Sequence, residues 1–487
     1  MAVQAKEAPS KNEGKLGLRI FDRGKSFVHR AKARMFEYAF TEALTLLAHS
    51  SEKNYVHLAK AFRLQAKDRT SRMVADWVER YLSPGNPGSA YLKRILTSID
   101  PNVRKSFIAG FIASLVFHDM TVMHKLPNGR VAPSPACVLI SPTMRCNLKC
   151  FGCYAGNYHK KDDMPQEVLE RVLGEARDLG TRFFIILGGE PLMYPGLLDV
   201  CKKFGDCVFQ IYTSGHLLTP EMAHQIVKIG NIAPQVSIEG FKEETEARRG
   251  AGGFDRAVRA MDLLREARAL FAFSVTVTQR NIDVVTSDEF IDFMIEKGAH
   301  YGWYFSYCPV GRNPDLSLMP TPQQRNQLRI AVNRIRVTKP ILVGDFWNDG
   351  ALSEGCLSGG RRYVHINNKG DVEPCVFVHF ATDNINNVSL KEALASDFFV
   401  AYRKASPFGT NLLRPCPIID RPHVLRGLVK KFGARPTHEG AETIVDDLAD
   451  DMDRYAAGLR EIYDPIWAEE YQWAADLHTD EKYRTPR

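Results

Sequence analysis

Three cysteines lie close together in the segment SPTMRCNLKCFGCYAG, where Cys146, Cys150 and Cys153 form a C-x3-C-x2-C arrangement. The apolar run Cys137–Ile140 precedes them, so we expect the thiols on a loop that follows a strand. A structural zinc site needs four ligands, and no fourth cysteine or histidine stands at a usable local spacing. Three thiolates suit a cube of four irons, because one iron then stays free to bind a cofactor. The other interpretation is a set of buried core thiols.

The elements that must position these cysteines are predicted after Pro133, where short apolar runs alternate with amphipathic helical patterns. The runs are Cys137–Ile140, Phe183–Leu187, Phe209–Tyr212, Gln235–Ile238, Phe271–Val277 and Trp303–Tyr307. Six such units predict an α/β fold with a parallel sheet and outer helices. Ligands of such sheets bind at the carboxyl ends of the strands, so the residues that follow each run are candidates for chemistry.

A second segment stands in the same kind of place as the cysteine loop. It is Gly188-Gly189-Glu190-Pro191, which directly follows another of these runs. Together the two segments resemble the radical S-adenosylmethionine (SAM) superfamily. The resemblance implies a partial (β/α)6 TIM-type barrel. It also implies a [4Fe-4S] cluster on the three cysteines, with SAM bound to the open iron through its amino and carboxylate groups.

The resemblance also indicates which residues contact SAM. Glu190 would take the methionine ammonium group, and Arg249 would pair with the methionine carboxylate unless it forms only a surface ion pair. The remaining expected contacts are Tyr154, Gly188, Gly189, Pro191, Ser214, Ser237 and Glu239. One position departs from the family: the residue before the third cysteine is usually aromatic there and is Gly152 here.

The implied activity is reductive cleavage of SAM at the cluster, which makes a 5′-deoxyadenosyl radical that abstracts hydrogen from a substrate. The cofactor carries this chemistry, and the protein orients the reactants in a dry cavity. Such an oxidoreductase needs a reductant such as ferredoxin or flavodoxin. The sequence assigns no catalytic side chain.

A second cysteine group follows the predicted barrel, in EGCLSGGRRYVHINNKGDVEPCVFVHF and LLRPCPIID. Cys356, Gly370 and Cys375 fit C-x13-G-x4-C, and Cys416 follows after a gap. This spacing resembles the SPASM and twitch extensions of radical SAM enzymes, in which a β-hairpin presents cysteines to an auxiliary iron–sulfur cluster. The candidates for a fourth ligand are His379, His423, Asp420, a water molecule and the substrate. Buried structural thiols are the other interpretation.

Two further features receive simpler interpretations. The other cysteines, Cys137, Cys201, Cys207 and Cys308, are expected to be core or helix-end thiols, and Cys308 differs only because it follows the last predicted strand. The segment Asp345–Gly350 combines acids with a tryptophan, and it is expected either to line the substrate site or to form a capped turn with an aromatic anchor.

Composition and charge limit the class of protein. The 487 residues are 45% hydrophobic and 25% charged, which is typical of globular proteins and excludes disordered and collagen-like chains. No apolar run reaches the ~18 residues of a spanning helix, and the N-terminus lacks the apolar part of a signal peptide, so we expect a cytoplasmic protein. Residues 1–135 carry 22 basic and 11 acidic side chains, whereas residues 441–487 carry 5 and 13. The basic residues are scattered, and we expect no nucleic-acid partner.

These patterns divide the chain into five expected parts. They are a disordered N-terminus (1–17), a basic helical domain (18–131), the radical SAM barrel (132–345), the auxiliary cluster segment (346–425) and an acidic helical region (426–487).

The N-terminal part bears on the substrate. Its run FIAGFIASLVF, Phe107–Phe117, is expected to be either core or a substrate surface. Beside a basic domain this run favours a lipid substrate, with peripheral attachment at the inner membrane face. The alternative is a ribosomal peptide maturase of the SPASM type, although residues 18–130 lack the winged-helix pattern that such maturases often carry. An iron–sulfur sensor is a further alternative, disfavoured because a sensor has no use for the SAM-binding segments.

Overall fold

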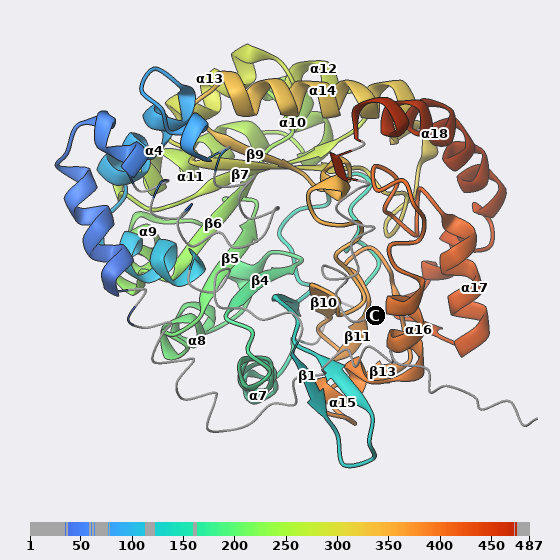
Figure 1. The fold of residues 1–487 in the computed structure, drawn as a ribbon. Helices are drawn as coiled ribbons and strands as arrows, with labels where there is room; N and C mark the ends of the chain where they lie inside the picture. Colours follow the sequence, from blue (N-terminus) through green and yellow to red (C-terminus); the bar gives the residue numbers. More distant parts are fainter. Residues whose placement is uncertain are drawn as a thin grey trace, which may run out of the picture.

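A ten-stranded sheet forms the centre of the computed structural model, within residues 35, 38–57, 60, 63, 76, 78–112, 122–158, 163–471 and 473–474, which the structure describes (Figure 1). The strands follow the order β13-β11-β10-β3-β4-β5-β6-β7-β8-β9. Their bounds are β3 Cys137–Thr143, β4 Phe183–Gly188, β5 Val208–Thr213, β6 Ile232–Ser237, β7 Ala272–Val277, β8 Tyr301–Ser306, β9 Leu342–Asp345, β10 Tyr363–Ile366, β11 Asp371–Glu373 and β13 Asp383–Asn384.

Strands β3 to β8 match the six predicted runs, and every neighbouring pair among them is parallel. Strand β9 extends this sheet beside β8, and β10 extends it beside β3, also in parallel. The sheet stays open, because β9 and β13 form its two edges. The expected partial barrel is therefore confirmed.

Helices cover the outer face of the sheet (Figure 1). They are α7 (Gln166–Asp178), α8 (Leu197–Lys203), α9 (Pro220–Ile229), α10 (Lys242–Arg249), α11 (Gly253–Glu266), α12 (Ile282–Val285), α13 (Asp288–Glu296) and α14 (Pro322–Thr338). Helix α9 shows how the sequence sets their bounds: the Thr219 hydroxyl accepts from the Met222 N–H at its start, and Gly230, with φ +86°, ends it.

Helices near the N-terminus close the amino edge of the barrel. They are α4 (Pro87–Ser98), α5 (Pro101–Val103) and the π-helix η2 (Arg104–Ala109). Their side chains Ile95, Ile99, Val103 and Phe107 form a buried cluster with Val208, Ala233 and Leu270, which lie at the amino ends of β5, β6 and β7. Arg94 fastens α4 to the barrel by donating to the Pro340 and Ala299 carbonyls at 2.7 and 2.8 Å.

This arrangement decides between two expectations for the N-terminal part and corrects a third. Phe107, at the start of the predicted apolar helix, is buried core in the barrel floor, which is one of the two expected places, and residues 113–117 of that helix lie outside the described part. The helical pattern expected through His124 ends earlier, because β1 (Met123–Lys125) pairs with β2 (Val131–Pro133) as a hairpin. Among the described residues, no helix is both long and apolar enough to cross a membrane.

The segment after the barrel contains the hairpin that was expected from VHINNKGDVEPC. Strands β10 and β11 are antiparallel, and the Gly370 N–H donates to the Asn367 carbonyl at 2.9 Å in the turn. Gly370 adopts φ +87°, which favours glycine. Because β10 also pairs with β3, the auxiliary segment continues the barrel sheet.

The remaining elements pack around this hairpin and on the barrel. They are β12 (Phe380–Ala381), β14 (Arg435–Pro436), α15 (Leu390–Leu394), α16 (Asp397–Ala405), α17 (Pro422–Phe432) and α18 (Ala449–Glu470), with short 3-10 helices η1 (Glu52–Asn54), η3 (Pro191–Met193), η4 (Leu316–Leu318), η5 (Asn348–Ala351) and η6 (Ala441–Ile444). Helix α18, in the acidic C-terminal region, packs against α14 of the barrel and against α17 (Figure 1).

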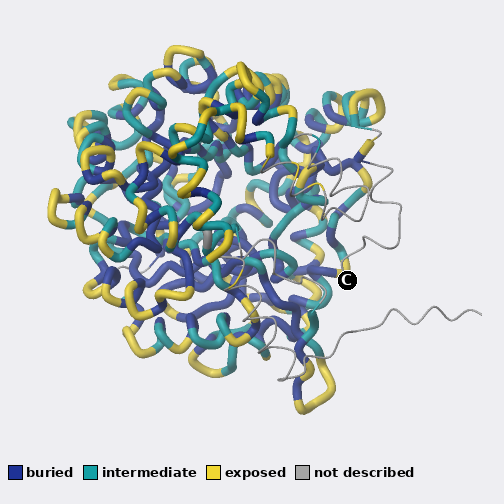
Figure 2. The backbone as a smooth tube through the Cα atoms, turned by 60° about the vertical axis from the view of Figure 1, so that its left-hand side comes forward, coloured by how far each residue is buried: buried dark blue, intermediate teal, exposed yellow. Residues whose placement is uncertain are grey.

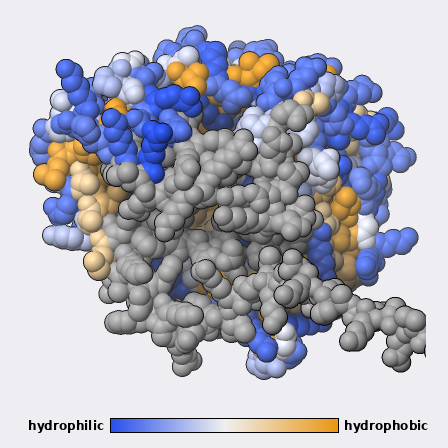
Figure 3. Space-filling view, in the orientation of Figure 1, coloured by the Kyte–Doolittle hydropathy of each residue, from blue (hydrophilic) through white to orange (hydrophobic). Residues whose placement is uncertain are grey.

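Burial follows these layers. Figure 2 shows buried residues along the inner strands and exposed residues on the outer turns of the helices. The described surface in Figure 3 is mostly hydrophilic, and apolar residues occur there as separate patches.

Candidate iron–sulfur and SAM site

The loop after β3 carries Cys146, Cys150 and Cys153, all half-buried and free of disulfides. Its backbone is held from two sides: the Phe151 N–H donates to the Arg248 carbonyl at 3.0 Å, and the Arg312 N–H donates to the Cys153 carbonyl at 3.0 Å. Burial raises the pKa of Cys146 to about 11, and the other two thiols add to this rise. The loop therefore brings the three predicted ligands together at the carboxyl edge.

The glycines after β4 let that strand approach the cysteine loop. A Cβ on Gly188 would lie 2.1 Å from the Thr143 carbonyl oxygen, and a Cβ on Gly189 would lie 2.1 Å from that of Arg145. Both contacts are with backbone atoms and leave no room for a side chain. The GGEP segment is therefore packed directly against the loop that carries the cysteines.

Glu190, an expected SAM contact, lies in a network of hydrogen bonds at the carboxyl edge of the sheet. Its carboxylate accepts from the Leu192 N–H at 3.2 Å, and from the Thr213 hydroxyl at 2.7 Å. It also accepts from the Ser214 N–H and hydroxyl, at 2.8 and 2.7 Å. These four hydrogen bonds hold the carboxylate in place, and its binding to the methionine ammonium group of SAM stays a prediction. Glu190 acts here as a positioning residue that joins the loops after β4 and β5.

Arg249 and Glu239, two expected SAM contacts, form a buried ion pair. Arg249 donates through Nε and Nη2 to Glu239 Oε1 at 2.9 and 2.6 Å, while Oε2 accepts from the Thr276 N–H at 2.9 Å. Arg249 is thus no surface ion pair. Ser237, the last residue of β6 and two positions before Glu239, shares a hydrogen bond with Ser274 at 3.2 Å.

Arg248 lies beside the cysteine loop, although no sequence pattern predicted it there. It also donates to Glu239 Oε1, at 2.6 Å, and its buried Nε has no partner in the structure. Burial opposes its charge, yet Glu239 and the thiols of Cys150 and Cys153 raise its pKa. Arg248 therefore places a positive charge beside the cysteine loop, and the only sequence signal was the Arg-Arg pair before Gly250.

Tyr154 lies between the two cysteine groups. Its ring meets Phe377 of the auxiliary segment edge-on, with 5.6 Å between centroids. Burial raises the pKa of its phenol, and the Cys153 thiol adds to the rise. The expected SAM contact is thus also a contact between the barrel and the auxiliary segment.

The second cysteine group lies in the segment that follows the barrel. Cys375 and Cys416 are buried and Cys356 is half-buried, and none forms a disulfide. The Ser358 hydroxyl lies 2.9 Å from Cys356 Sγ, and the Tyr363 hydroxyl lies 2.9 Å from Cys375 Sγ. Hydrogen bonds to the sulfurs are a common means of tuning iron–sulfur clusters.

Within the part of the chain that the structure describes, no three His, Cys, Asp or Glu side chains converge on the position of one metal ion. In the first group a backbone hydrogen bond reaches a sulfur, since the Leu148 N–H donates to Cys146 Sγ at 3.4 Å.

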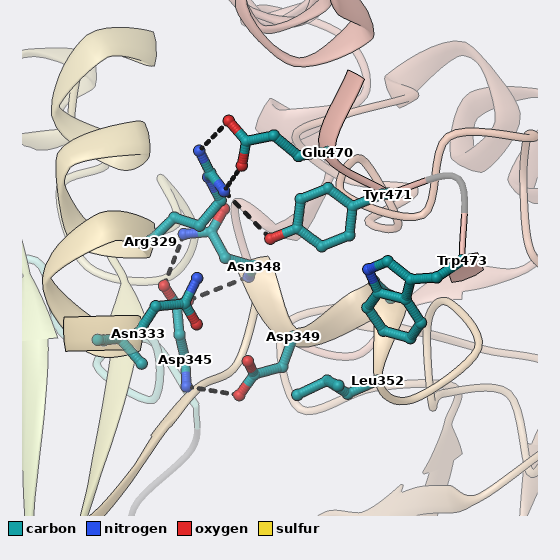
Figure 4. A pocket seen from close by; sticks show the side chains of 11 residues that line it. Arg329, Asn333, Asp345, Asn348, Asp349, Leu352, Glu470, Tyr471 and Trp473 are labelled. Atoms are coloured by element: carbon teal, nitrogen blue, oxygen red, sulfur yellow. Dashed lines mark hydrogen bonds and ion pairs between the residues drawn. The ribbon is translucent and has the colours of Figure 1, made fainter. Parts of the chain in front are cut away.

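The segment Asp345–Gly350 forms the expected capped turn. Asp345 Oδ1 accepts from the N–H groups of Trp347 and Asn348 at 3.2 and 3.1 Å, and Trp347 is buried. Burial raises the pKa of Asp345 to about 6, and Asp349 adds to the rise. Asp345 also lines a cavity of about 280 Å³ beside α14 and the end of α18 (Figure 4). Other residues that line it are Arg329, Asn348, Asp349, Glu470 and Tyr471.

Comparisons with known proteins agree with this geometry. Residues 140–291 match the family model of the radical SAM superfamily, and residues 356–417 match that of an iron–sulfur cluster-binding domain, SPASM. Mycofactocin maturase MftC of Mycobacterium tuberculosis (strain CDC 1551 / Oshkosh) is 32% identical over 276 residues, which are 52% of this chain and 68% of that protein. The chain belongs to the radical SAM superfamily.

Two more relatives are named for different reactions. PqqA peptide cyclase of Streptomyces rochei is 28% identical, over 64% of this chain and 88% of the relative. AdoMet-dependent heme synthase of Methanosarcina barkeri is 24% identical, over 53% of this chain and 82% of the relative. The protein is therefore a radical SAM enzyme with a SPASM segment, whose cofactors are SAM, a [4Fe-4S] cluster and an auxiliary iron–sulfur cluster.

Proposed function

We propose that this radical SAM enzyme modifies a peptide by abstracting a hydrogen atom from it. The observation that carries the proposal is the similarity to PqqA peptide cyclase, which extends over 64% of this chain, more than the SAM-binding barrel alone. The lipid substrate that the sequence favoured loses part of its support, because Phe107, at the start of the apolar run, is packed in the barrel floor.

The described residues fit the tasks that this function requires. Cys146, Cys150 and Cys153 would hold the cluster, which together with SAM supplies the 5′-deoxyadenosyl radical when bound. Arg248 would attract the carboxylate end of SAM, because its charge is buried and its Nε lacks a partner. Ferredoxin or flavodoxin would supply the electron.

The test has two stages. Anaerobically reduced enzyme with SAM should release 5′-deoxyadenosine, and Cys150→Ala should release none because one of three ligands is lost. Cys201→Ala is the control, because this buried thiol on α8 lies outside both cysteine groups. Equal release by wild type and Cys150→Ala would contradict the ligand assignment.

The second stage separates the substrates. Peptides encoded by short reading frames beside the gene, anionic phospholipid vesicles and an iron porphyrin precursor are each added with SAM. Faster 5′-deoxyadenosine release and a changed peptide mass are expected with a peptide. Stimulation only by vesicles or by the porphyrin would overturn the peptide proposal.

A further inference from the structure

Two hydroxyl groups lie against sulfurs of the second cysteine group. Ser358 Oγ lies 2.9 Å from Cys356 Sγ, and the Tyr363 hydroxyl group lies 2.9 Å from Cys375 Sγ. Both hydroxyl groups belong to deeply buried residues, because Ser358 is 1% exposed and Tyr363 is 5% exposed. A buried hydroxyl group that lacks a hydrogen bond is costly, so each of the two needs its partner.

Tyr363 is held where its hydroxyl group reaches the sulfur. It is the first residue of β10, which pairs with β3 on one side and with β11 on the other. Its ring contacts Phe346, with 6.2 Å between centroids. Among the described residues, Cys375 Sγ is the one hydrogen-bond partner of its hydroxyl group. The buried phenol therefore depends on this sulfur.

Ser358 is aligned by a second buried phenol. The hydroxyl group of Tyr402, on α16, lies 2.9 Å from Ser358 Oγ, and Tyr402 is 0% exposed. The Ser358 oxygen thus has the phenol on one side and Cys356 Sγ on the other. The three groups form a chain that ends on the sulfur.

Metal binding gives this chain a single direction. A cysteine that binds iron is a thiolate, which has no proton and can only accept a hydrogen bond. Ser358 must then donate to Cys356 Sγ, which leaves its oxygen to accept from Tyr402. Tyr363 must likewise donate to Cys375 Sγ. All three hydroxyl protons then have an acceptor.

Backbone groups add two donors at this site. The Phe377 N–H donates to Cys375 Sγ at 3.5 Å, and the Ile418 N–H donates to Cys416 Sγ at 3.4 Å. Cys375 Sγ thus receives one hydrogen bond from the backbone and one from a phenol. The hydroxyl donors are the part of this arrangement that a substitution can remove without changing the backbone.

The first cysteine group differs in this respect. Within the described part of the chain, one hydrogen bond reaches its sulfurs, from the Leu148 N–H to Cys146 Sγ at 3.4 Å. Hydrogen bonds to the sulfurs stabilise a reduced cluster, because reduction adds negative charge that the donors attract. The second group is therefore the one whose side chains are placed to favour the reduced state.

We propose that Tyr363 and Ser358, with Ser358 aligned by Tyr402, raise the reduction potential of the auxiliary cluster by donating hydrogen bonds to its cysteine sulfurs. They are positioning residues, because they act on the cluster through Cys375 and Cys356. The inference rests on the assignment of these two cysteines to the auxiliary cluster. A measured potential involves neither a peptide nor SAM cleavage, so its failure is distinct from failure of the proposed function.

Redox titration followed by electron paramagnetic resonance measures the potential directly. SAM changes the signal of the cluster that it binds, which identifies the auxiliary cluster as the other one. Tyr363→Phe keeps the ring and removes the hydroxyl group, so the potential of the auxiliary cluster should fall while that of the SAM cluster stays the same. Tyr304→Phe is the matched control, because this buried phenol on β8 donates to the Val285 carbonyl instead. It should change neither potential.

The serine branch gives a graded series. Ser358→Ala removes the donor to Cys356 Sγ and should lower the potential of the auxiliary cluster, as Tyr363→Phe does. Tyr402→Phe should lower it less than Ser358→Ala, since Ser358 still donates. Unchanged potentials in both Tyr363→Phe and Ser358→Ala would overturn the proposal.

Iron content separates an effect on the potential from loss of the cluster. Each variant should keep about eight irons per chain, as the wild type does. Loss of about four irons in Tyr363→Phe or in Ser358→Ala would show that the hydroxyl group retains the cluster rather than sets its potential, and this would also overturn the proposal.

Discussion

The ring of Tyr307 occupies the space into which a side chain at position 152 would project. Gly152 adopts φ +60°, and a Cβ there would lie 2.6 Å from Tyr307 Cε2. The Tyr307 hydroxyl accepts from the Asp315 N–H at 3.1 Å, which fixes the ring. Where the family usually carries an aromatic residue before the third cysteine, this chain thus places an aromatic ring from the end of β8.

Gly152→Ala should therefore disturb the SAM cluster. The new methyl group would meet the Tyr307 ring, in addition to the cost of about 1 kcal/mol for a left-handed conformation. We expect lower iron content and slower 5′-deoxyadenosine release. Gly129→Ala is the matched control, because Gly129 also has positive φ, +82°, but open space around it. Equal effects of the two substitutions would mean that the contact with Tyr307 is unimportant.

Glu190→Gln should weaken the site without removing a cluster ligand. An amide cannot accept the four hydrogen bonds that this carboxylate accepts, so at least one buried donor loses its partner, at a cost of about 1–3 kcal/mol. Chemical denaturation should show lower stability, and SAM affinity should fall. Glu167→Gln, at an exposed position of α7, should change neither. Unchanged SAM affinity in Glu190→Gln would contradict its positioning role.

Cys375→Ala should separate SAM cleavage from product formation. The three cysteines of the first loop remain, so 5′-deoxyadenosine release should continue, while substrate conversion should fall sharply. Product and 5′-deoxyadenosine are measured in the same reaction, with Cys207→Ala as the control. Loss of both activities in Cys375→Ala would indicate that the second group mainly stabilises the fold.

Stability should fall at acidic pH because of His300. This side chain is buried between α4 and β8, with Nε2 2.9 Å from the Ser98 hydroxyl, and burial lowers its pKa from 6.5 to about 3, with Arg94 adding to the effect. The unfolded chain binds this proton below pH 6.5 and the folded chain does not. The free energy of unfolding should thus lose about 2 kcal/mol between pH 8 and pH 5 through this group.

Denaturant titrations at both pH values measure this loss. His300→Gln cannot take up the proton, so its stability should fall less over the same range. An equal fall in the variant and in the wild type would assign the acid sensitivity to other groups.

The sequence predicted features that depend on neighbouring residues. The strands β3 to β8, the hairpin around Gly370 and the ligand loop with Cys146 each have a local pattern of apolar residues, turn residues or cysteines. Local patterns do not predict contacts between residues that are distant in the sequence. Tyr154, for example, contacts Phe377 of the auxiliary segment, which stands 223 positions later.

The place of the apolar run at Phe107 also depends on distant contacts. The sequence allowed either core or a substrate surface, and the burial of Phe107 depends on Val208 and Leu270, more than 100 residues later. The hydrogen bonds that Glu190 accepts from the Thr213 and Ser214 hydroxyl groups, at the end of the next strand, were likewise not predicted from the sequence.

The closed amino edge beneath β5, β6 and β7 limits the directions from which the barrel can be reached. Ile95, Ile99 and Phe107 pack against that edge, whereas the cysteine loop lies at the opposite, carboxyl edge. We therefore expect SAM to enter from the side of the cysteine loop. A substrate that approaches SAM from the same side would cover it, so we expect SAM to bind before the substrate.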